Sequence, residues 1–254
     1  GCVKNEKRTM ETLILYILLI TFFASLFRST FGFGESMIAV PLYCLFLPMV
    51  QAVPIAILMS ITIAAMVIVQ DRKEVHFSNA KWLVIFAVLG FPFGLLILLY
   101  GNEFFIKLGL GLMVVLYSLY SLFVKPIFSK EKPGWLWVFS CGFLSGVFGG
   151  AYGFNGPPLV LYGNRMGWEG RLFRATMQAY FLPVGLISIV GYWAKDLVNQ
   201  QVLVYFLFML PALVPGVYIG RYLHNKIKGQ SFYSYAYCAL IIIGLIFIVN
   251  TLLG

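Results

Sequence analysis

Eight long apolar regions, separated by short polar segments, constrain this chain more than any other feature. They are residues 12–48, 53–70, 82–100, 104–124, 135–164, 172–194, 202–223 and 232–253. Six of them are close to the roughly 20 residues that a helix needs to cross the hydrocarbon core of a bilayer. Since lipid cannot satisfy free backbone groups, such regions are expected to form helices. The pattern predicts an all-α integral membrane protein.

The composition supports this prediction. Of the 254 residues, 61% are hydrophobic and only 11% are charged, whereas about a quarter of the residues of a soluble domain are charged. These values exclude a soluble enzyme domain, a disordered chain and a disulfide scaffold. The net charge of +9 is what basic cytoplasmic loops produce in a membrane protein. We therefore expect the lipid bilayer, and no nucleic acid, as a partner.

The sequence contains no recognisable catalytic or metal-binding motif. His-Glu-x-x-His, Gly-x-Ser-x-Gly and the phosphate-binding Gly-x-x-x-x-Gly-Lys pattern are all missing, and the two histidines, His76 and His224, lie in polar segments. The four cysteines form no Cys-x-x-Cys pair, so free thiols are expected. We predict that the protein is not an enzyme and needs no metal or cofactor.

The N-terminal segment differs from the rest of the chain. Residues 1–9 are polar, and Met10-Glu11-Thr12 ahead of an apolar run resembles a natural start. We expect residues 1–9 to be a tail, either a cloning remnant or an extended start, without functional weight. The run from Leu13 to Phe27 lacks an Ala-x-Ala-like exit, so no cleavable signal peptide is expected.

Two of the apolar regions are too long for one crossing and reveal an internal repeat. Residues 12–48 as a single helix would extend about 55 Å, against about 30 Å of hydrocarbon. Both long regions contain glycine-rich tracts, and Gly153 follows Gly32 by 121 residues. We predict repeat one over residues 10–124, a cytoplasmic linker over 125–134 and repeat two over 135–254. Each repeat is expected to be a broken helical hairpin followed by three transmembrane helices.

The distribution of Lys and Arg predicts that the two repeats are inverted. If each long region enters and leaves on the same side, twelve basic residues share one side: Arg72, Lys73, Lys81, Lys125, Lys130, Lys132, Arg165, Arg171, Arg174, Arg221, Lys226 and Lys228. The other side then has five: Lys4, Lys7, Arg8, Lys107 and Lys195. Parallel repeats would give ten against seven, a weaker bias than the positive-inside rule favours. We expect the linker, with Lys130, to be cytoplasmic and both termini to be external.

Inverted repeats with broken helices are typical of secondary transporters, which bind substrate near the midplane between half-helix ends. The helix after each break would begin near Ser36 and near Pro157, and a helix start favours an anion. The predicted substrate-binding residues at the two breaks are Gly32, Gly34, Ser36, Tyr152, Gly153 and Asn155. The open alternative is that the glycines only allow close helix packing.

Two embedded charges flank the first break. Arg28 and Glu35 lie well inside an apolar region, where a charge is costly and so suggests function. Arg28 would bind a bidentate anion, and Glu35 could carry a coupling proton. The alternative is a structural ion pair that orders the hairpin tip.

Other polar residues allow two interpretations each. Asn155 either contacts substrate or caps the broken helix, and Gln178 either binds substrate or packs between helices. The better interpretation of Arg165, Arg171 and Arg174 is that they are cytoplasmic topology anchors.

Two glycine-rich segments carry a family resemblance. Phe31-Gly32-Phe33-Gly34-Glu35-Ser36-Met37-Ile38-Ala39-Val40-Pro41-Leu42 and Gly142-Phe143-Leu144-Ser145-Gly146-Val147-Phe148-Gly149-Gly150 together resemble the TauE/SafE sulfite exporter family, over essentially the whole chain. The resemblance implies a bacterial-type inner-membrane, multi-pass permease for sulfite, thiosulfate or sulfonates. Glu35 stands where the family more often has a glycine, and the second tract ends in Asn155-Gly156-Pro157-Pro158. These departures put the particular substrate in doubt.

The leading hypothesis is therefore a secondary transporter for a small sulfur-containing anion, with a possible coupling proton. Two alternatives stay open: a transporter for a carboxylate or another non-sulfur anion, and a membrane assembly or scaffold protein. The sequence leaves the transport direction and the oligomeric state open.

Overall fold

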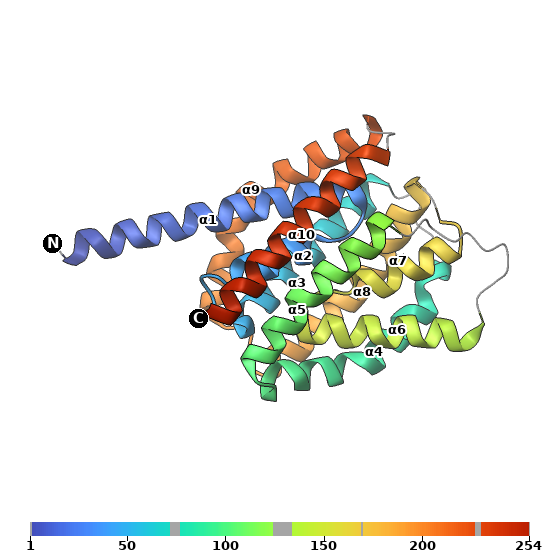
Figure 1. Ribbon diagram of the computed structural model, residues 1–254, viewed down its shortest axis with the longest axis horizontal. Coiled ribbons are helices and arrows are strands. Elements are labelled where there is room, and N and C mark those ends of the chain that lie inside the picture. Colours follow the sequence, from blue (N-terminus) through green and yellow to red (C-terminus); the bar gives the residue numbers. More distant parts are fainter. Residues whose placement is uncertain (1, 72–76, 124–133, 169, 227–229, 254) are drawn as a thin grey trace.

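The computed structural model describes residues 2–71, 77–123, 134–168, 170–226 and 230–253, and these form a helical protein (Figure 1). The helices are α1 (Cys2–Phe31), α2 (Glu35–Tyr43), α3 (Met49–Gln70), α4 (Phe77–Tyr100), α5 (Glu103–Phe123), α6 (Trp135–Tyr152), α7 (Gly156–Arg165), α8 (Gly170–Trp193), α9 (Gln200–Lys226) and α10 (Gln230–Leu253). The expected all-helical fold is confirmed, with no strand among the described residues. Residues 2–9, expected as a tail, continue α1 toward its N-terminus.

Eight helices are long and apolar enough to cross a membrane, counted over the described residues: α1, α3, α4, α5, α6, α8, α9 and α10. The two remaining helices, α2 and α7, are short and follow the two breaks. Each predicted half therefore contains a long helix, a short helix and three long helices in the same order. The linker expected over residues 125–134 lies almost wholly outside the described residues.

The long helices pack as exchanged pairs between the two predicted halves. Helix α1 packs along α9, and α6 packs along α4, while α3 packs on α8 and α5 on α10. This exchange of partners is what a two-fold relation between the halves produces, and the start of α1 and the end of α10 lie toward the same end of the molecule (Figure 1). The arrangement fits two halves of the same architecture, and the inverted orientation of the repeats stays a prediction.

Glycines allow the exchanged pairs to approach closely. In α4, a β-carbon on Gly94 would overlap the backbone of α6 at Val147, and in α9 a β-carbon on Gly220 would lie 2.6 Å from the carbonyl oxygen of Leu26 in α1. Small residues are the usual means of bringing helix backbones together in lipid, where the hydrophobic effect does not drive helix association. The close packing holds α1 and α6, which carry the two breaks, firmly against the other half.

Candidate functional site

The two helix breaks meet in the interior of the protein. They share a small cavity whose volume of about 10 Å³ accommodates the centre of roughly one water molecule. Its lining residues are Gly34, Glu35, Ser36, Ile57, Ser60, Gly153, Phe154, Asn155, Gly156, Phe181 and Gly185. The first break, the second break and the middle of α3 and α8 thus surround one point. A break in a membrane helix is tolerated where protein buries it, and these two breaks bury each other.

The first break depends on two glycines with left-handed backbone. Gly32 has φ of 91° and Gly34 has φ of 95°, a region that residues with a β-carbon rarely adopt. A β-carbon on Gly34 would also lie 2.8 Å from Cε1 of Phe27. The chain can therefore turn from α1 into α2 at this point because both residues are glycine.

The second break ends α6 in a left-handed C-cap turn. Gly153, with φ of 65°, donates its N–H to the carbonyl of Gly149 at 2.9 Å, and Phe154 donates to Phe148 at 3.4 Å. The hydroxyl of Ser145 donates to the carbonyl of Asn155 at 2.8 Å and so anchors the turn to α6. The Asn155 Oδ1 atom is buried and has no hydrogen-bond donor within the described structure.

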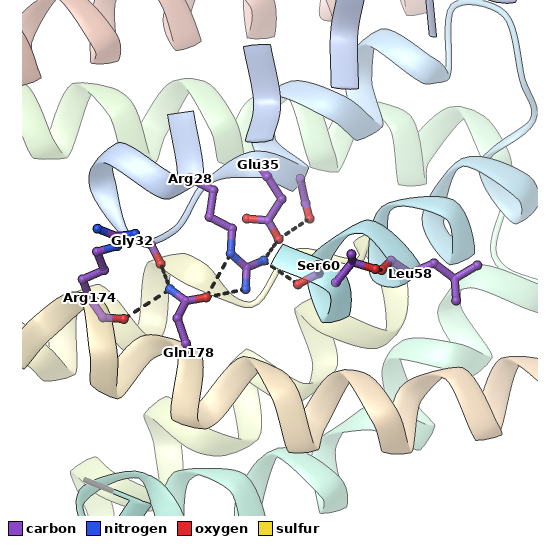
Figure 2. Close-up of polar contacts among 9 residues, drawn as sticks. Arg28, Gly32, Glu35, Leu58, Ser60, Arg174 and Gln178 are labelled. Atoms are coloured by element: carbon purple, nitrogen blue, oxygen red, sulfur yellow. Dashed lines mark hydrogen bonds and ion pairs between the residues drawn. The ribbon is translucent and has the colours of Figure 1, made fainter. Parts of the chain in front are cut away.

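Arg28 is the centre of the polar network beside the cavity (Figure 2). Its Nη1 donates to the Glu35 carboxylate and, at 2.5 Å, to the hydroxyl of Ser60. Its Nε and Nη2 both donate to Oε1 of Gln178, at 3.2 and 2.7 Å. The guanidinium also stacks over the ring of Phe181, 4.5 Å from the centroid. The side chain is fully buried, so this network compensates its charge inside the protein.

Gln178 connects this network to the backbone of the first break. Its Nε2 donates to the carbonyl of Gly32 at 2.8 Å and to the carbonyl of Arg174 at 3.2 Å. One amide therefore holds the guanidinium of Arg28 with its oxygen and the turn of α1 with its nitrogen. If Arg28 exchanged Glu35 for another partner, Gln178 would transmit the resulting movement to the backbone at the tip of the hairpin.

The two short helices offer an anion different numbers of donors. Helix α2 begins with Glu35 and Ser36, whose backbone N–H groups lie in its first turn, and no side chain caps it. Helix α7 begins Gly156-Pro157-Pro158, and proline has no N–H to donate. Helix α7 therefore contributes its dipole and few donors, whereas the donors come mainly from the α2 side.

The structure brings most of the predicted site residues together. Gly34, Glu35, Ser36, Gly153 and Asn155 line the cavity. Arg28, Gly32 and Gln178 form the network directly behind it. Tyr152 lies outside the cavity and is directed toward α5, where its hydroxyl would meet a β-carbon on Gly109 at 2.8 Å.

Two side chains of this region are not predicted from the sequence, and a third lies elsewhere than its interpretation implied. Ser60 and Phe181 both contact the Arg28 guanidinium, and Arg174, interpreted as a topology anchor, is 1% exposed inside the protein. A lone serine or phenylalanine in an apolar helix gives no signal of its position. The side chain of Arg171, interpreted in the same way as Arg174, lies outside the described residues.

No group of three or more metal-ligating side chains occurs within the described ranges. The described helices define a multi-pass membrane protein in which two broken helices meet around a buried arginine and carboxylate.

The chain belongs to the family described as sulfite exporter TauE/SafE, whose model matches residues 17–247. This is a family of membrane transporters. Neither the search of curated proteins nor the search of solved structures found a significant match.

Proposed function

We propose that the protein is a secondary transporter that moves a small sulfur-containing oxyanion, such as sulfite, thiosulfate or an organosulfonate, across a bacterial-type inner membrane. The observation that carries the proposal is the meeting of both helix breaks at one buried cavity next to Arg28. Membership of a transporter family supports the same class of function. The proposed site lies between the two breaks.

The size of the cavity implies that this conformation is closed. A space for about one water molecule cannot hold sulfite, thiosulfate or an organosulfonate, each of which has at least four heavy atoms, so binding requires the tips to separate. Gly34 and Gly153 form those tips, and their movement would expose the cavity to one side at a time. In transporters built from two repeats, such alternating access comes largely from one repeat or bundle moving against the other around a fixed site.

Arg28 would bind the anion in exchange for Glu35. The guanidinium already donates to one carboxylate, one hydroxyl and one amide, and an oxyanion presents the same acceptor chemistry as that carboxylate. Protonation of Glu35 would weaken its hold on Arg28 and free those donors. One proton and one anion would then enter the site together, which couples the anion to a proton gradient.

Uptake into proteoliposomes tests the proposal. The purified protein should accumulate ³⁵S-labelled sulfite or thiosulfate when an inward proton gradient is imposed, and unlabelled substrate should compete. Glu35→Gln should retain exchange of internal for external anion and lose accumulation driven by the gradient. Lys107→Gln, which removes an exposed i,i+4 ion pair with Glu103, is the matched control and should transport normally.

The same assay separates the alternatives. If the protein takes up a labelled dicarboxylate and no sulfur oxyanion, its substrates are carboxylates and the proposed substrate class is wrong. If folded and correctly oriented protein neither binds nor transports either class of anion, the assembly or scaffold function is the remaining alternative.

A further inference from the structure

A second charged cluster lies outside the central site, where α3, α8 and α9 come together. Asp71, directly after α3, faces two guanidinium groups. Its Oδ2 lies 3.6 Å from Nη1 of Arg174, and its Oδ1 lies 3.4 Å from Nη2 of Arg221. The side chains are 2%, 38% and 10% exposed for Arg174, Arg221 and Asp71. The cluster therefore extends from the interior, at Arg174, to the surface, at Arg221.

The Asp71 carboxylate is held loosely for a buried ion pair. Both separations exceed the 2.7–2.9 Å typical of charge-assisted hydrogen bonds. Its Oδ2 has no hydrogen-bond partner among the described residues, and the same is true of both amide atoms of the adjacent Gln70. One carboxylate thus faces two positive charges at long separations, while Nη2 of Arg221 also donates to the carbonyl of Gln70 at 3.1 Å. A ligand with more oxygens could satisfy both guanidinium groups better.

The cluster is connected to the central site through α8. Arg174 lies one helical turn before Gln178 and accepts a hydrogen bond from its Nε2 through its carbonyl. Nη2 of Arg174 also donates to the hydroxyl of Ser29 in α1 at 3.3 Å. A β-carbon on Gly32 would lie 3.2 Å from the α-carbon of Arg174. Arg174 therefore contacts the turn that forms the first break.

The opposite end of the molecule has no comparable charge at the equivalent position. Tyr192, 121 residues after Asp71, lies at the end of α8. Its hydroxyl donates to the carbonyls of Gly149 and Gly150, both at 3.0 Å. The equivalent positions thus carry an ionic contact at one end and a neutral hydrogen bond at the other. Among the described residues this ionic contact occurs at one end, so the repeated fold by itself does not require it.

We propose that Arg174 and Arg221 form a second anion-binding site, which Asp71 occupies in this conformation as a tethered carboxylate. A small oxyanion passing between the central site and this end displaces Asp71 and binds both guanidinium groups. This inference rests on the proposed transport function and adds a binding site on the route. Because Asp71 follows α3 and both arginines belong to the second half, displacement also releases a contact between the halves.

The physical basis is competition between a tethered and a free anion. Guanidinium groups stay charged and present planar pairs of donors that match oxyanions. Asp71 has the advantage of a high effective concentration and the disadvantage of poor geometry. Removing its charge while keeping its size should therefore leave the site vacant and raise its affinity for a free anion.

Modification of Arg221 by phenylglyoxal, quantified for each arginine by mass spectrometry of the purified protein, tests the site directly. In Asp71→Asn the modification of Arg221 should be several-fold faster than in wild type, because its carboxylate partner is gone and the neutral carbonyl of Gln70 remains as its hydrogen-bond acceptor. Millimolar sodium sulfate should slow it again, whereas sodium chloride of equal ionic strength should not. Arg165, exposed and stacked over Trp137 at 5.2 Å, is the internal control whose modification rate should stay constant.

A second variant keeps the test decisive if Asp71→Asn does not fold. Asp71→Asn/Arg174→Gln removes one charge of each sign, so Arg221 should again react faster than in wild type, but sulfate should give no protection. An Arg221 rate unchanged by both variants, or equal protection by sulfate and chloride in Asp71→Asn, overturns the proposal. So does full sulfate protection in the double variant. This experiment measures anion binding at one residue and does not depend on transport. Failure of the proposed transport function would instead appear in the uptake assays, so the two failures can be distinguished.

Discussion

The Asn155 side chain lies against Gly149, which is about one turn before the end of α6. A β-carbon on Gly149 would lie 2.8 Å from Cγ of Asn155. Gly149 is 121 residues after Arg28, and the two residues therefore occupy equivalent positions in the two halves. The first half has a long cation at this position, and the second has the space that accommodates an amide. The central site is consequently asymmetric, with its positive charge on one hairpin and a neutral amide on the other.

Gly149→Ala should displace the Asn155 amide from the cavity wall. The added methyl group overlaps the amide, and overpacking of this kind costs about 1–3 kcal/mol. We expect reduced uptake with the protein still inserted, measured by proteoliposome transport and by thermal unfolding in detergent.

A double-mutant cycle identifies the cause of that effect. In Asn155→Ala the space beside Gly149 is vacant, so adding Gly149→Ala should cost little further stability or activity. Additive losses in the double variant would show that Gly149 acts through some other contact, such as the hydrogen bonds from Tyr192.

Much of this arrangement follows from the sequence, and the rest depends on helix faces. Glycine tracts in regions too long for one crossing locate both breaks, and the depth of Arg28 and Glu35 in an apolar run suggests their pairing. Ser60, Phe181 and the burial of Arg174 depend on which faces of α3 and α8 turn toward α1. In helices that are apolar on most sides, hydrophobic periodicity does not specify that rotation. The orientation of Tyr152 toward α5 escapes prediction for the same reason.

The two tip glycines should differ in their tolerance of a side chain. Gly34→Ala combines a left-handed backbone with a contact of 2.8 Å to Phe27, whereas a β-carbon on Gly153 would lie 3.4 Å from its nearest neighbour. Left-handed strain alone costs about 1–3 kcal/mol. We expect Gly34→Ala to lower the unfolding temperature and the uptake more than Gly153→Ala does.

Gly167 supplies the control for backbone strain. Its φ is 67° and a β-carbon there would meet nothing within 4 Å. Gly167→Ala should therefore show the cost of left-handed backbone alone and leave uptake intact. If Gly34→Ala and Gly167→Ala reduce the unfolding temperature and the uptake equally, Gly34 has no special role at the first break.

The topology can be tested at two exposed residues at opposite ends of the molecule. In a variant with its native cysteines replaced by serine, Asn102→Cys, between α4 and α5, should react with a membrane-impermeant maleimide in intact cells. Lys226→Cys, at the end of α9, should react only after the membrane is permeabilised, because the basic loops are expected on the cytoplasmic side. The reverse labelling pattern would show that the protein has the opposite orientation in the membrane. Labelling of both residues in intact cells would contradict the prediction that they lie on opposite sides.

The Arg28–Glu35 pair is the strongest candidate for the anion-binding site. The same pair also stabilises the fold, so its effects on stability and on binding have to be measured separately. Removing one partner leaves the other charge buried, so Arg28→Ala or Glu35→Ala should each cost about 3–5 kcal/mol of stability. Arg28→Met/Glu35→Gln removes both charges and should recover most of that stability. Thermal unfolding in detergent measures all four proteins, counting the wild type.

Binding in the same double variant then separates site from scaffold. An anion held by Arg28 has no guanidinium left to bind, so the double variant should be stable and yet lose stabilisation by millimolar sulfite or thiosulfate at the central site. Arg28→Lys should weaken binding without abolishing it, since a point charge cannot reproduce the planar donors that contact Gln178 and Glu35. Because Arg174 and Arg221 are intact in these variants, sulfate protection of Arg221 in the Asp71→Asn background should persist. A stable double variant that still binds and transports the anion would reduce Arg28 and Glu35 to a structural pair and move the search for the anion to the backbone donors at the start of α2.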